Sequence, residues 1–172
     1  MKTTVILHNI RSVYNVGSIF RTADAAGVEK IYLCGITPAP HDRLGNLRKD
    51  FAKVALGAER YIAWENKKST ARTIVALKND GWKIFAIEQS MASEPFNLLK
   101  GKMSNSKIAL ILGDEVRGLP PSILKLADKI LEIPMRGATI QDMRHPKHTK
   151  KGKESLNVAV AFGVVVFGMQ KR

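Results

Sequence analysis

The hydrophobic positions of the chain follow two different spacings. Short runs rich in Val, Ile, Leu and Thr occupy residues 3–8, 30–34 and 107–112, and such runs predict β-strands. The last run is apolar almost throughout, which is typical of a strand buried on both faces of a sheet. Between the first two runs, apolar residues recur every three to four positions over residues 16–26. This spacing predicts a helix, which Gly27 is suited to end.

The alternation of strand and helix continues to the C-terminus. We expect further strands at residues 60–64, 82–87 and 130–133, further helices at 50–56, 69–79, 120–127 and 156–169, and loops at 35–48 and 94–106. Strands that alternate with helices indicate an α/β fold. In such a fold we expect a mainly parallel sheet with helices on both of its faces.

The chain is strongly basic. Its 172 residues include 28 Lys and Arg but 15 Asp and Glu, which gives a net charge of +13. A field of this sign attracts polyanions, so nucleic acid is the expected partner. An anionic membrane surface and a basic surface without such a partner are the alternatives, although no basic amphipathic helix favours the membrane. No apolar run reaches the ~20 residues that span a bilayer, so we expect no membrane segment.

Several common classes lack support in the sequence. Cys34 is the single cysteine, so no internal disulfide can form and a cytoplasmic protein is expected. The chain does not begin with the pattern of a signal peptide. It contains no G-x-x-x-x-G-K-[ST] phosphate loop, no G-x-S-x-G elbow, and no G-x-G-x-x-G turn after the first strand. The four histidines have no partner cysteines and form no H-E-x-x-H, so we expect no metal site.

Three polar segments follow predicted strands, and the first leads into the predicted helix at residues 16–26. Asn15 is placed to cap this helix, and Arg21, six residues later, is expected in its second turn. The N-terminus of a helix carries free N–H groups and a partial positive charge, which suit a phosphate or a developing alkoxide. The alternative is an ordinary capped helix with a surface arginine.

The second segment is Leu-Gly-Asp-Glu-Val-Arg-Gly-Leu at residues 112–119. It places two carboxylates and a guanidinium directly beyond an apolar strand, where open α/β sheets bind ligands. Gly113 and Gly118 allow unusual backbone angles or close approach of a ligand. The alternative is a turn with a local ion pair. We favour a functional role, because a buried strand rarely ends in such dense charge.

The third segment joins Ile-Pro-Met at residues 133–135 to Ser155 and Asn157. Pro134 cannot donate a ladder hydrogen bond, so it ends the last strand and leaves neighbouring backbone groups free for a ligand. Ser155 and Asn157 lie at the start of an apolar helix. Polar side chains at that place either cap the helix or contact a ligand.

Taken in this order, the three segments resemble the SpoU/TrmH family within the SPOUT class of RNA methyltransferases, over most of the chain. The resemblance implies transfer of a methyl group from S-adenosyl-L-methionine to a ribose 2′-hydroxyl of tRNA or rRNA. It also implies a C-terminal trefoil knot and a homodimer. It implies as catalytic residues Arg21, Asn15, Glu115, Ser155 and Asn157, and as cofactor-binding residues Gly113, Ile133, Met135 and Leu156.

The resemblance also suggests roles for individual residues. Arg21 is often proposed as the base in such a site, but a guanidinium stays protonated at neutral pH. We therefore interpret Arg21 as an electrostatic clamp for the developing alkoxide. Glu115 is expected to orient either Arg21 or the neighbouring helix end. The loop after Ile87 is expected to form another wall of the cofactor site.

One departure from the family pattern is a longer, strongly basic loop at residues 136–154. We expect residues 1–172 to form a single SpoU-like domain with this loop inserted in the knot region, and without a separate N-terminal RNA-binding domain. We hypothesise that the loop contacts RNA phosphates. The predicted RNA-binding residues are Arg11, Arg117, Arg144, Lys147, Lys150, Lys151 and Lys153.

Two rival functions remain open on the sequence. One is a non-catalytic RNA-binding or assembly factor with the same fold. The other is an unknotted nucleotide-binding α/β enzyme that acts on a small anionic substrate. The presence of Arg21, Glu115, Ser155 and Asn157 argues against the first, and the missing phosphate-binding motifs together with the net charge of +13 argue against the second. No local motif specifies tRNA or rRNA, or the nucleotide that is modified.

Overall fold

The computed structural model describes residues 1–99, 103, 105–135 and 155–170. Within these residues, seven strands form one sheet in the order β3-β2-β1-β6-β4-β7-β5, and every neighbouring pair is parallel. The strands are β1 (Lys2–His8), β2 (Lys30–Cys34), β3 (Ala63–Lys67), β4 (Lys83–Ile87), β5 (Glu94–Pro95), β6 (Lys107–Leu112) and β7 (Lys129–Glu132).

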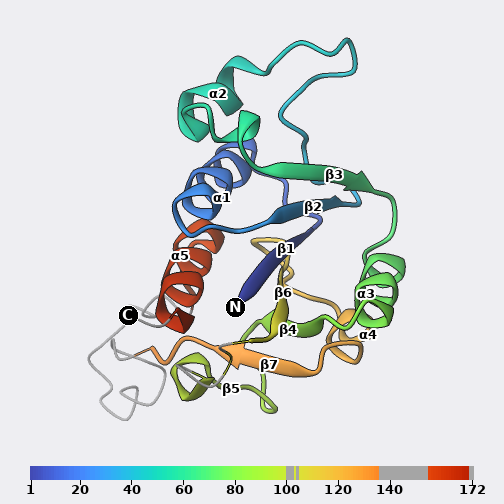
Figure 1. Ribbon diagram of the computed structural model, residues 1–172, viewed down its shortest axis with the longest axis vertical. Helices are drawn as coiled ribbons and strands as arrows, with labels where there is room; N and C mark the ends of the chain where they lie inside the picture. The colour runs from blue at the N-terminus through green and yellow to red at the C-terminus, as the bar shows by residue number, and fades with distance from the viewer. Residues whose placement is uncertain (100–102, 104, 136–154, 171–172) are drawn as a thin grey trace, which may run out of the picture.

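Helices cover both faces of the sheet. They are α1 (Val13–Ala25), α2 (Lys49–Ala55), α3 (Thr70–Asn79), α4 (Pro121–Leu124) and α5 (Val158–Met169), together with the short 3-10 helices η1 (Ala58–Arg60) and η2 (Phe96–Leu99). Figure 1 shows α1, α2 and α5 on one side of the sheet and α3 and α4 on the other. The predicted mainly parallel α/β fold is therefore confirmed.

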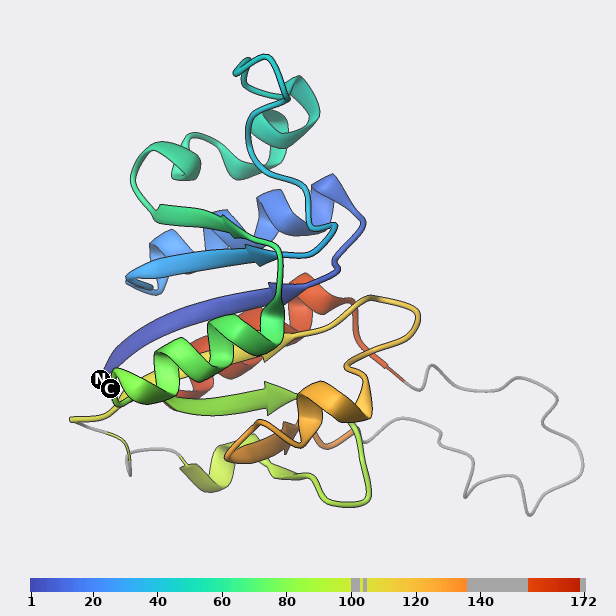
Figure 2. The ribbon, with the colours of Figure 1, turned by 90° about the vertical axis from the view of Figure 1, so that its right-hand side faces the viewer.

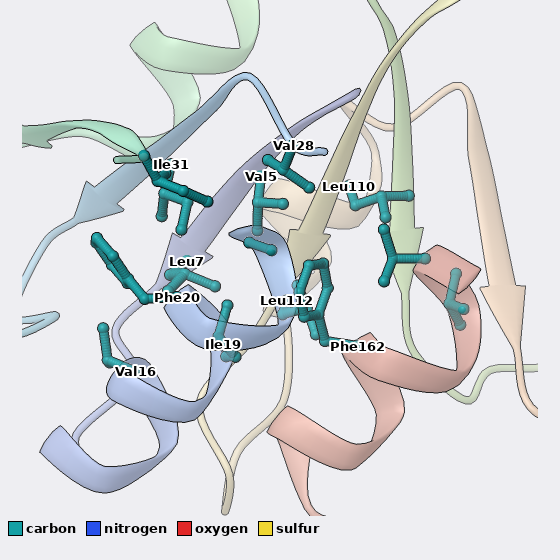
Figure 3. Close-up of a cluster of buried hydrophobic side chains, with 14 of the residues drawn as sticks. Val5, Leu7, Val16, Ile19, Phe20, Val28, Ile31, Leu110, Leu112 and Phe162 are labelled. Atoms are coloured by element: carbon teal, nitrogen blue, oxygen red, sulfur yellow. The ribbon is translucent and has the colours of Figure 1, made fainter. Parts of the chain in front are cut away.

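The central strand β6 contributes to a separate core on each face. Ile108, Leu110 and Leu112 pack toward the helices α1 and α5, whereas Ala109 and Ile111 pack toward α3 and α4. This alternation follows from the two-residue period of a strand. Figure 3 shows the larger core, in which side chains from β1, β6, α1 and α5 meet. The prediction that residues 107–112 are buried on both faces is confirmed.

The carboxyl ends of the parallel strands meet at one edge of the sheet. In Figure 2 the arrowheads point to the same edge, and α1 and α5 both begin there. The loops that follow β1, β4 and β6 leave the sheet at this edge too. The three polar segments of the sequence are therefore brought to one end of the molecule, although more than 100 residues separate the first from the third.

Three predicted elements were wrong in position or type. The third strand runs from Ala63 to Lys67 rather than over residues 60–64, because Gly57 has a positive φ of 91° and leads into η1 (Ala58–Arg60). Residues 94–99, predicted as loop, form β5 and η2. The helix that follows Pro120 has four residues, so it is shorter than the predicted 120–127.

Some expectations concern the chain as a whole. The trefoil knot would form around residues 136–154, which lie outside the described residues, so the knot stays a prediction. The single-domain organisation of residues 1–172 stays a prediction as well. Among the described residues, no helix is long and apolar enough to cross a membrane.

Candidate functional site

A pocket opens at the carboxyl edge of the sheet, with a volume of about 280 Å³. The ends of β4, β6 and β7 and the first turn of α5 form its walls. All four residues predicted to bind the cofactor, Gly113, Ile133, Met135 and Leu156, line this pocket. The loop after Ile87 also lines it, through Glu88 and Gln89. The pocket therefore gathers residues that lie up to 74 positions apart, from Ile87 to Ala161.

The pocket combines apolar walls with carboxylates. The apolar side comes from the strand ends and from α5, including Leu112, Leu131 and Val158. Carboxylates come from the loops after β4 and β6 and from the end of β7. A flat aromatic ring suits the apolar walls, and a cationic group suits the carboxylates. The lining of the pocket therefore fits a ligand that has both a flat aromatic ring and a cationic group.

Asp114 organises the loop that follows β6. Its Oδ1 accepts the backbone N–H groups of Val116 at 2.9 Å and Arg117 at 2.8 Å, and its Oδ2 lies 3.1 Å from Nε of Arg11. The hydrogen bond from the N–H of Arg117 is the largest cause that holds the pKa of Asp114 below its ordinary value, and Arg11 adds to it. Asp114 is 7% exposed. It is therefore a structural carboxylate that stays ionised.

Two glycines in this loop have no room for a side chain. A Cβ on Gly113 would lie 2.5 Å from the carbonyl carbon of Gly118. Gly118 has a φ of +65°, and a Cβ there would lie 2.3 Å from Oε2 of Glu88. Gly113 therefore lets the loop close on its own backbone, and Gly118 lets it pack against Glu88 at the end of β4.

Glu88 joins two walls of the pocket, and the sequence analysis did not single it out. Its Oε2 accepts the N–H of Leu119 at 2.8 Å, and its Oε1 accepts the N–H of Gln89 at 3.0 Å. The backbone N–H of Glu88 donates to the carbonyl of Leu131 in β7 at 3.0 Å. A carboxylate directly after a buried strand was the available signal, as it was for residues 112–119.

Side chains from the three polar segments form one hydrogen-bonded chain. Nδ2 of Asn15 donates to Oε1 of Glu115 at 2.8 Å, and Nδ2 of Asn157 donates to Oδ1 of Asn15 at 3.0 Å. Oε2 of Glu115 also accepts the backbone N–H of Arg11 at 3.4 Å. We call Asn15, Glu115 and Asn157 the polar chain. Its members are 100 and 142 positions apart, so the fold alone brings them together.

The cap of α1 differs from the prediction, and the cap of α5 is one of its two candidate residues. Ser12, not Asn15, caps α1, because its Oγ accepts the N–H of Asn15 at 3.2 Å. Asn15 lies inside the first turn, which leaves its side chain free for the polar chain. Asn157, not Ser155, caps α5, because its Oδ1 accepts the N–H groups of Ala159 at 2.9 Å and Val160 at 3.4 Å. Ser155 lies two residues before this cap and lines the pocket.

Arg21 does not join the other predicted catalytic residues. It lies in the third turn of α1, because the helix begins at Val13, and its side chain is exposed. Six residues of helix place Arg21 about 240° around the axis from Asn15. Among the residues that the structure describes, Arg21 has no hydrogen-bond or ion-pair partner. Glu115 therefore contacts the end of α1, which is one of its two expected partners, and not Arg21.

The predicted RNA-binding residues divide into two groups. Arg11 and Arg117 line a second cavity of about 300 Å³, which shares Asp114, Arg117 and Gly118 with the pocket. The others fall on the 136–154 loop, outside the described residues: Arg144, Lys147, Lys150, Lys151 and Lys153. Over the part of the chain that the structure describes, no three His, Cys, Asp or Glu side chains gather as metal ligands.

His8 lines the second cavity as a neutral ring. Nδ2 of Asn9 is 3.1 Å from Nε2 of His8 and can only donate, so Nε2 accepts. Nδ1 then carries the proton and donates to Oγ1 of Thr70 at 2.7 Å. Burial lowers the pKa of His8 below its ordinary value, and the charge of Asp114 opposes this shift in part. Both ring nitrogens are therefore occupied.

Comparison with known proteins gives relatives over nearly the whole chain. The tRNA (guanosine(18)-2′-O)-methyltransferase of Aquifex aeolicus is 26% identical over 98% of this chain and 68% of its own. The structure of an AdoMet-bound rRNA methyltransferase from Sinorhizobium meliloti is 26% identical, with a TM-score of 0.79 over 98% of this chain and 55% of that chain. A structure described by the 2-OH methylation of C/U34 on tRNA is 25% identical, with a TM-score of 0.70 over 98% of this chain and 93% of that one.

The extent of these matches differs from one relative to the next. The chain spans from about half to about two thirds of the length of the curated relatives it matches. The family model described as the SpoU rRNA Methylase family matches residues 2–140, which include β1 to β7 and the first two polar segments. The chain therefore belongs to the SpoU rRNA Methylase family.

Proposed function

We propose that this protein transfers a methyl group from S-adenosyl-L-methionine to a ribose 2′-hydroxyl of tRNA or rRNA. The observation that carries the proposal is the polar chain at the pocket. Asn15, Glu115 and Asn157 come from three separate segments, and Glu115 also lines the pocket. The names of the relatives support it, since they describe methylation of tRNA and of rRNA.

The pocket is the proposed cofactor site. Its apolar walls suit the adenine ring, and its carboxylates suit a sulfonium and an ammonium group. Gly113, Ile133, Met135 and Leu156 would hold the cofactor there, which supplies an electrophilic methyl group when bound. The AdoMet-bound relative from Sinorhizobium meliloti supports this choice of cofactor.

The polar chain is the proposed positioning device for the ribose. Glu115 fixes the amide of Asn15, and Asn15 in turn fixes the amide of Asn157, which caps α5. Ser155 also lines this pocket, and its hydroxyl can donate to or accept from the ribose. Methyl transfer requires an in-line approach of the ribose oxygen, so a rigid set of hydrogen-bonding groups raises the rate by orientation.

Arg21 is the proposed clamp that stabilises the developing alkoxide. Its guanidinium is exposed and lies on another face of α1 from Asn15. To act on the ribose at this pocket, Arg21 must be brought there by the bound RNA or by a second copy of the chain. The proposal for Arg21 therefore depends on assembly.

A homodimer is the proposed assembly, through the exposed side of α5. The helix is apolar all round, yet Val160, Val164 and Phe167 remain 52%, 39% and 47% exposed. They recur at a spacing of four and three residues, which forms one stripe along the helix. An apolar helix is usually buried on all sides. A second copy that covers the stripe would bury it.

The proposed RNA contacts are Arg11, Arg117 and the basic residues of the 136–154 loop. The net charge of +13 supports a polyanionic partner. We also propose that the protein acts in the cytoplasm, where tRNA and rRNA are available to it.

The proposal is tested by methyl transfer from radiolabelled S-adenosyl-L-methionine to unmodified tRNA and rRNA transcripts. A methylated ribose makes the adjacent phosphodiester resistant to alkali, because the 2′-hydroxyl is the attacking group in alkaline cleavage. We expect label in alkali-resistant dinucleotides. Label that is recovered entirely in mononucleotides would place the methyl group on a base and contradict the proposal. The absence of label on either RNA, with the cofactor bound, would support a non-catalytic RNA-binding protein.

A further inference from the structure

The second cavity lies beside the proposed cofactor pocket. It has a volume of about 300 Å³ and is lined by the ends of β1 and β2, the loop after β6 and Pro120. Because the two cavities share Asp114, Arg117 and Gly118, a single loop separates their contents. The volume is at the lower end of the ~300–1,000 Å³ typical of small-ligand sites. It suits a single nucleotide better than a larger ligand.

Most polar side chains in the second cavity are already hydrogen-bonded within the protein. His8 uses both ring nitrogens, on Thr70 and Asn9. Oδ1 of Asn9 accepts the N–H of Ile36 at 3.2 Å. Nε of Arg11 is held by Asp114. These side chains build the wall of the cavity.

Arg117 is different. Its backbone N–H is fixed by Asp114, but its side chain is exposed and has no partner among the residues that the structure describes. The cavity also presents two apolar groups, Ile36 and Pro120, and Ile36 is 64% exposed. Within the described residues, the cavity thus offers in Arg117 a guanidinium without an ion-pair partner next to an apolar surface. Proteins that bind single-stranded RNA use this combination, with cations on the phosphates and apolar or aromatic surfaces against the bases.

We propose that the second cavity binds the nucleotide next to the methylated ribose, with Arg117 on its phosphate and Ile36 against its base. The inference rests on the proposed RNA methyl transfer and adds a subsite to it. The shared loop places this nucleotide adjacent to the cofactor pocket. Because an RNA chain continues from one nucleotide to the next, the subsite would set the register of the target ribose. Such contacts bind the RNA equally in the ground state and in the transition state, so their loss raises KM more than it lowers kcat.

The test compares Arg117→Ala and Arg117→Lys with Lys83→Ala as the matched control. Lys83 is an exposed cation at the amino end of β4, which is the opposite edge of the sheet, so its removal changes the net charge without touching the cavity. The measurements are fluorescence anisotropy with labelled unmodified tRNA and rRNA transcripts at several salt concentrations, calorimetry with S-adenosylhomocysteine, and methyl-transfer kinetics.

We expect Arg117→Ala to raise the KM for RNA about tenfold with a smaller change in kcat, and to reduce the salt slope by ~0.7, the value for one phosphate contact on a single strand. Arg117→Lys should restore part of the affinity, because a phosphate accepts either cation. Because Arg117 also lines the first pocket, the Kd for S-adenosylhomocysteine should change by much less than the affinity for RNA. An RNA affinity equal to that of Lys83→Ala would overturn the proposal. A loss of cofactor affinity as large as the loss of RNA affinity would also overturn it, since Arg117 would then serve the first pocket.

A second arm tests the apolar contact. Ile36→Asp places a carboxylate where the base and phosphate would lie, and we expect at least a tenfold loss of RNA affinity. Val75→Asp is the control, because Val75 is 50% exposed on α3 and lies outside the cavity. Equal affinities of the two variants would contradict the subsite. If the wild type binds RNA but transfers no methyl group, the proposed function fails while the RNA titrations still decide the subsite. If the wild type binds no RNA, both the proposed function and the proposed subsite are wrong.

Discussion

Asn157 serves two purposes with the two atoms of one amide. Its Oδ1 caps α5, and its Nδ2 donates to Asn15 in the polar chain. A cap contributes about 1 kcal/mol to helix stability. The hydrogen bond to Asn15 is part of the polar chain and is proposed to serve catalysis rather than helix stability. A substitution that changes one atom of the amide and keeps the other can therefore separate stability from activity.

Asn157→Asp should preserve the fold and impair catalysis. The carboxylate can still cap α5, and a negative charge suits a helix N-terminus. The second carboxylate oxygen would face Oδ1 of Asn15, and two acceptors repel each other. We expect methyl transfer to fall about 100-fold, because the positioning groups shift. Thermal unfolding should stay near that of the wild type. Asn157→Ala is the comparison, since it loses the cap as well; full activity of Asn157→Asp would remove the polar chain from the mechanism.

His8 should make stability depend on pH below neutrality. Burial lowers its pKa in the folded state, whereas the unfolded chain titrates near the ordinary value of 6.5. Between these two values the unfolded state binds the proton more readily, so folding stability decreases as pH falls below about 6.5. Chemical denaturation measured between pH 7.5 and 5 checks this. His8→Gln, which cannot titrate, should flatten this part of the curve, and an unaltered curve would contradict the assignment.

At the scale of elements, the loop after β6 depends on the end of β4. Glu88 accepts the N–H of Leu119 and occupies the space that a Cβ on Gly118 would need. A hydrogen bond to a charged group contributes roughly 1.5–3 kcal/mol. Without it, the loop that carries Gly113 and Glu115 loses an anchor on the pocket side. The shape of the pocket is therefore set by contacts between loops as well as within them.

Glu88→Ala should weaken cofactor binding. We expect the Kd for S-adenosylhomocysteine to rise about tenfold, because the loop must be ordered at the moment of binding. Calorimetry measures this directly. Glu29→Ala is the matched control: Glu29 forms an exposed ion pair with Lys2 at 3.4 Å, and surface pairs of this kind contribute little. Similar Kd values for the two variants would show that the loop holds its shape without Glu88.

Predictions of elements from the sequence succeeded where the pattern was local. The strand β6 and the helix α3 follow from the spacing of apolar residues alone. The boundaries failed at β3, where the backbone angle of Gly57 shifted the strand by three residues. The two-residue strand β5 depends on pairing with β7, and no local pattern encodes such a pairing.

The site shows the same division. The resemblance to the SpoU/TrmH family implied that Gly113, Ile133, Met135 and Leu156 bind the cofactor, and all four line the pocket. The rule that ligands bind at the carboxyl ends of strands accounts for Gly113 and Ile133, which directly follow β6 and β7. The predicted cap of α1 was wrong, because Ser12 and Asn15 are both good capping residues. Ser12 caps the helix, and the side chain of Asn15 hydrogen-bonds to Glu115 instead. No local pattern encodes a contact between residues 100 positions apart, such as that of Asn15 with Glu115.

At the scale of the whole molecule, the apolar stripe of α5 should control the oligomeric state. Val164→Glu places a charge in the middle of the stripe, where Val164 is 39% exposed. We expect this variant to sediment as a monomer, and methyl transfer to fall if Arg21 acts through a second copy. Val75→Glu on α3 is the control and should sediment like the wild type. A wild-type protein that is monomeric at micromolar concentration would contradict the homodimer.

The place of β6 in the sheet has a consequence for how the chain folds. β6 lies between β1 and β4, and its register pairs Lys2 with Lys107 and Leu7 with Leu112. The strand at the very start of the chain therefore finds one of its two neighbours after more than 100 further residues. Pairings of such long range slow folding, because the entropy of loop closure is lost before the contacts form. During synthesis, one edge of β1 stays open until residue 112 has left the ribosome, so the growing chain is exposed to aggregation while the residues between β1 and β6 are made.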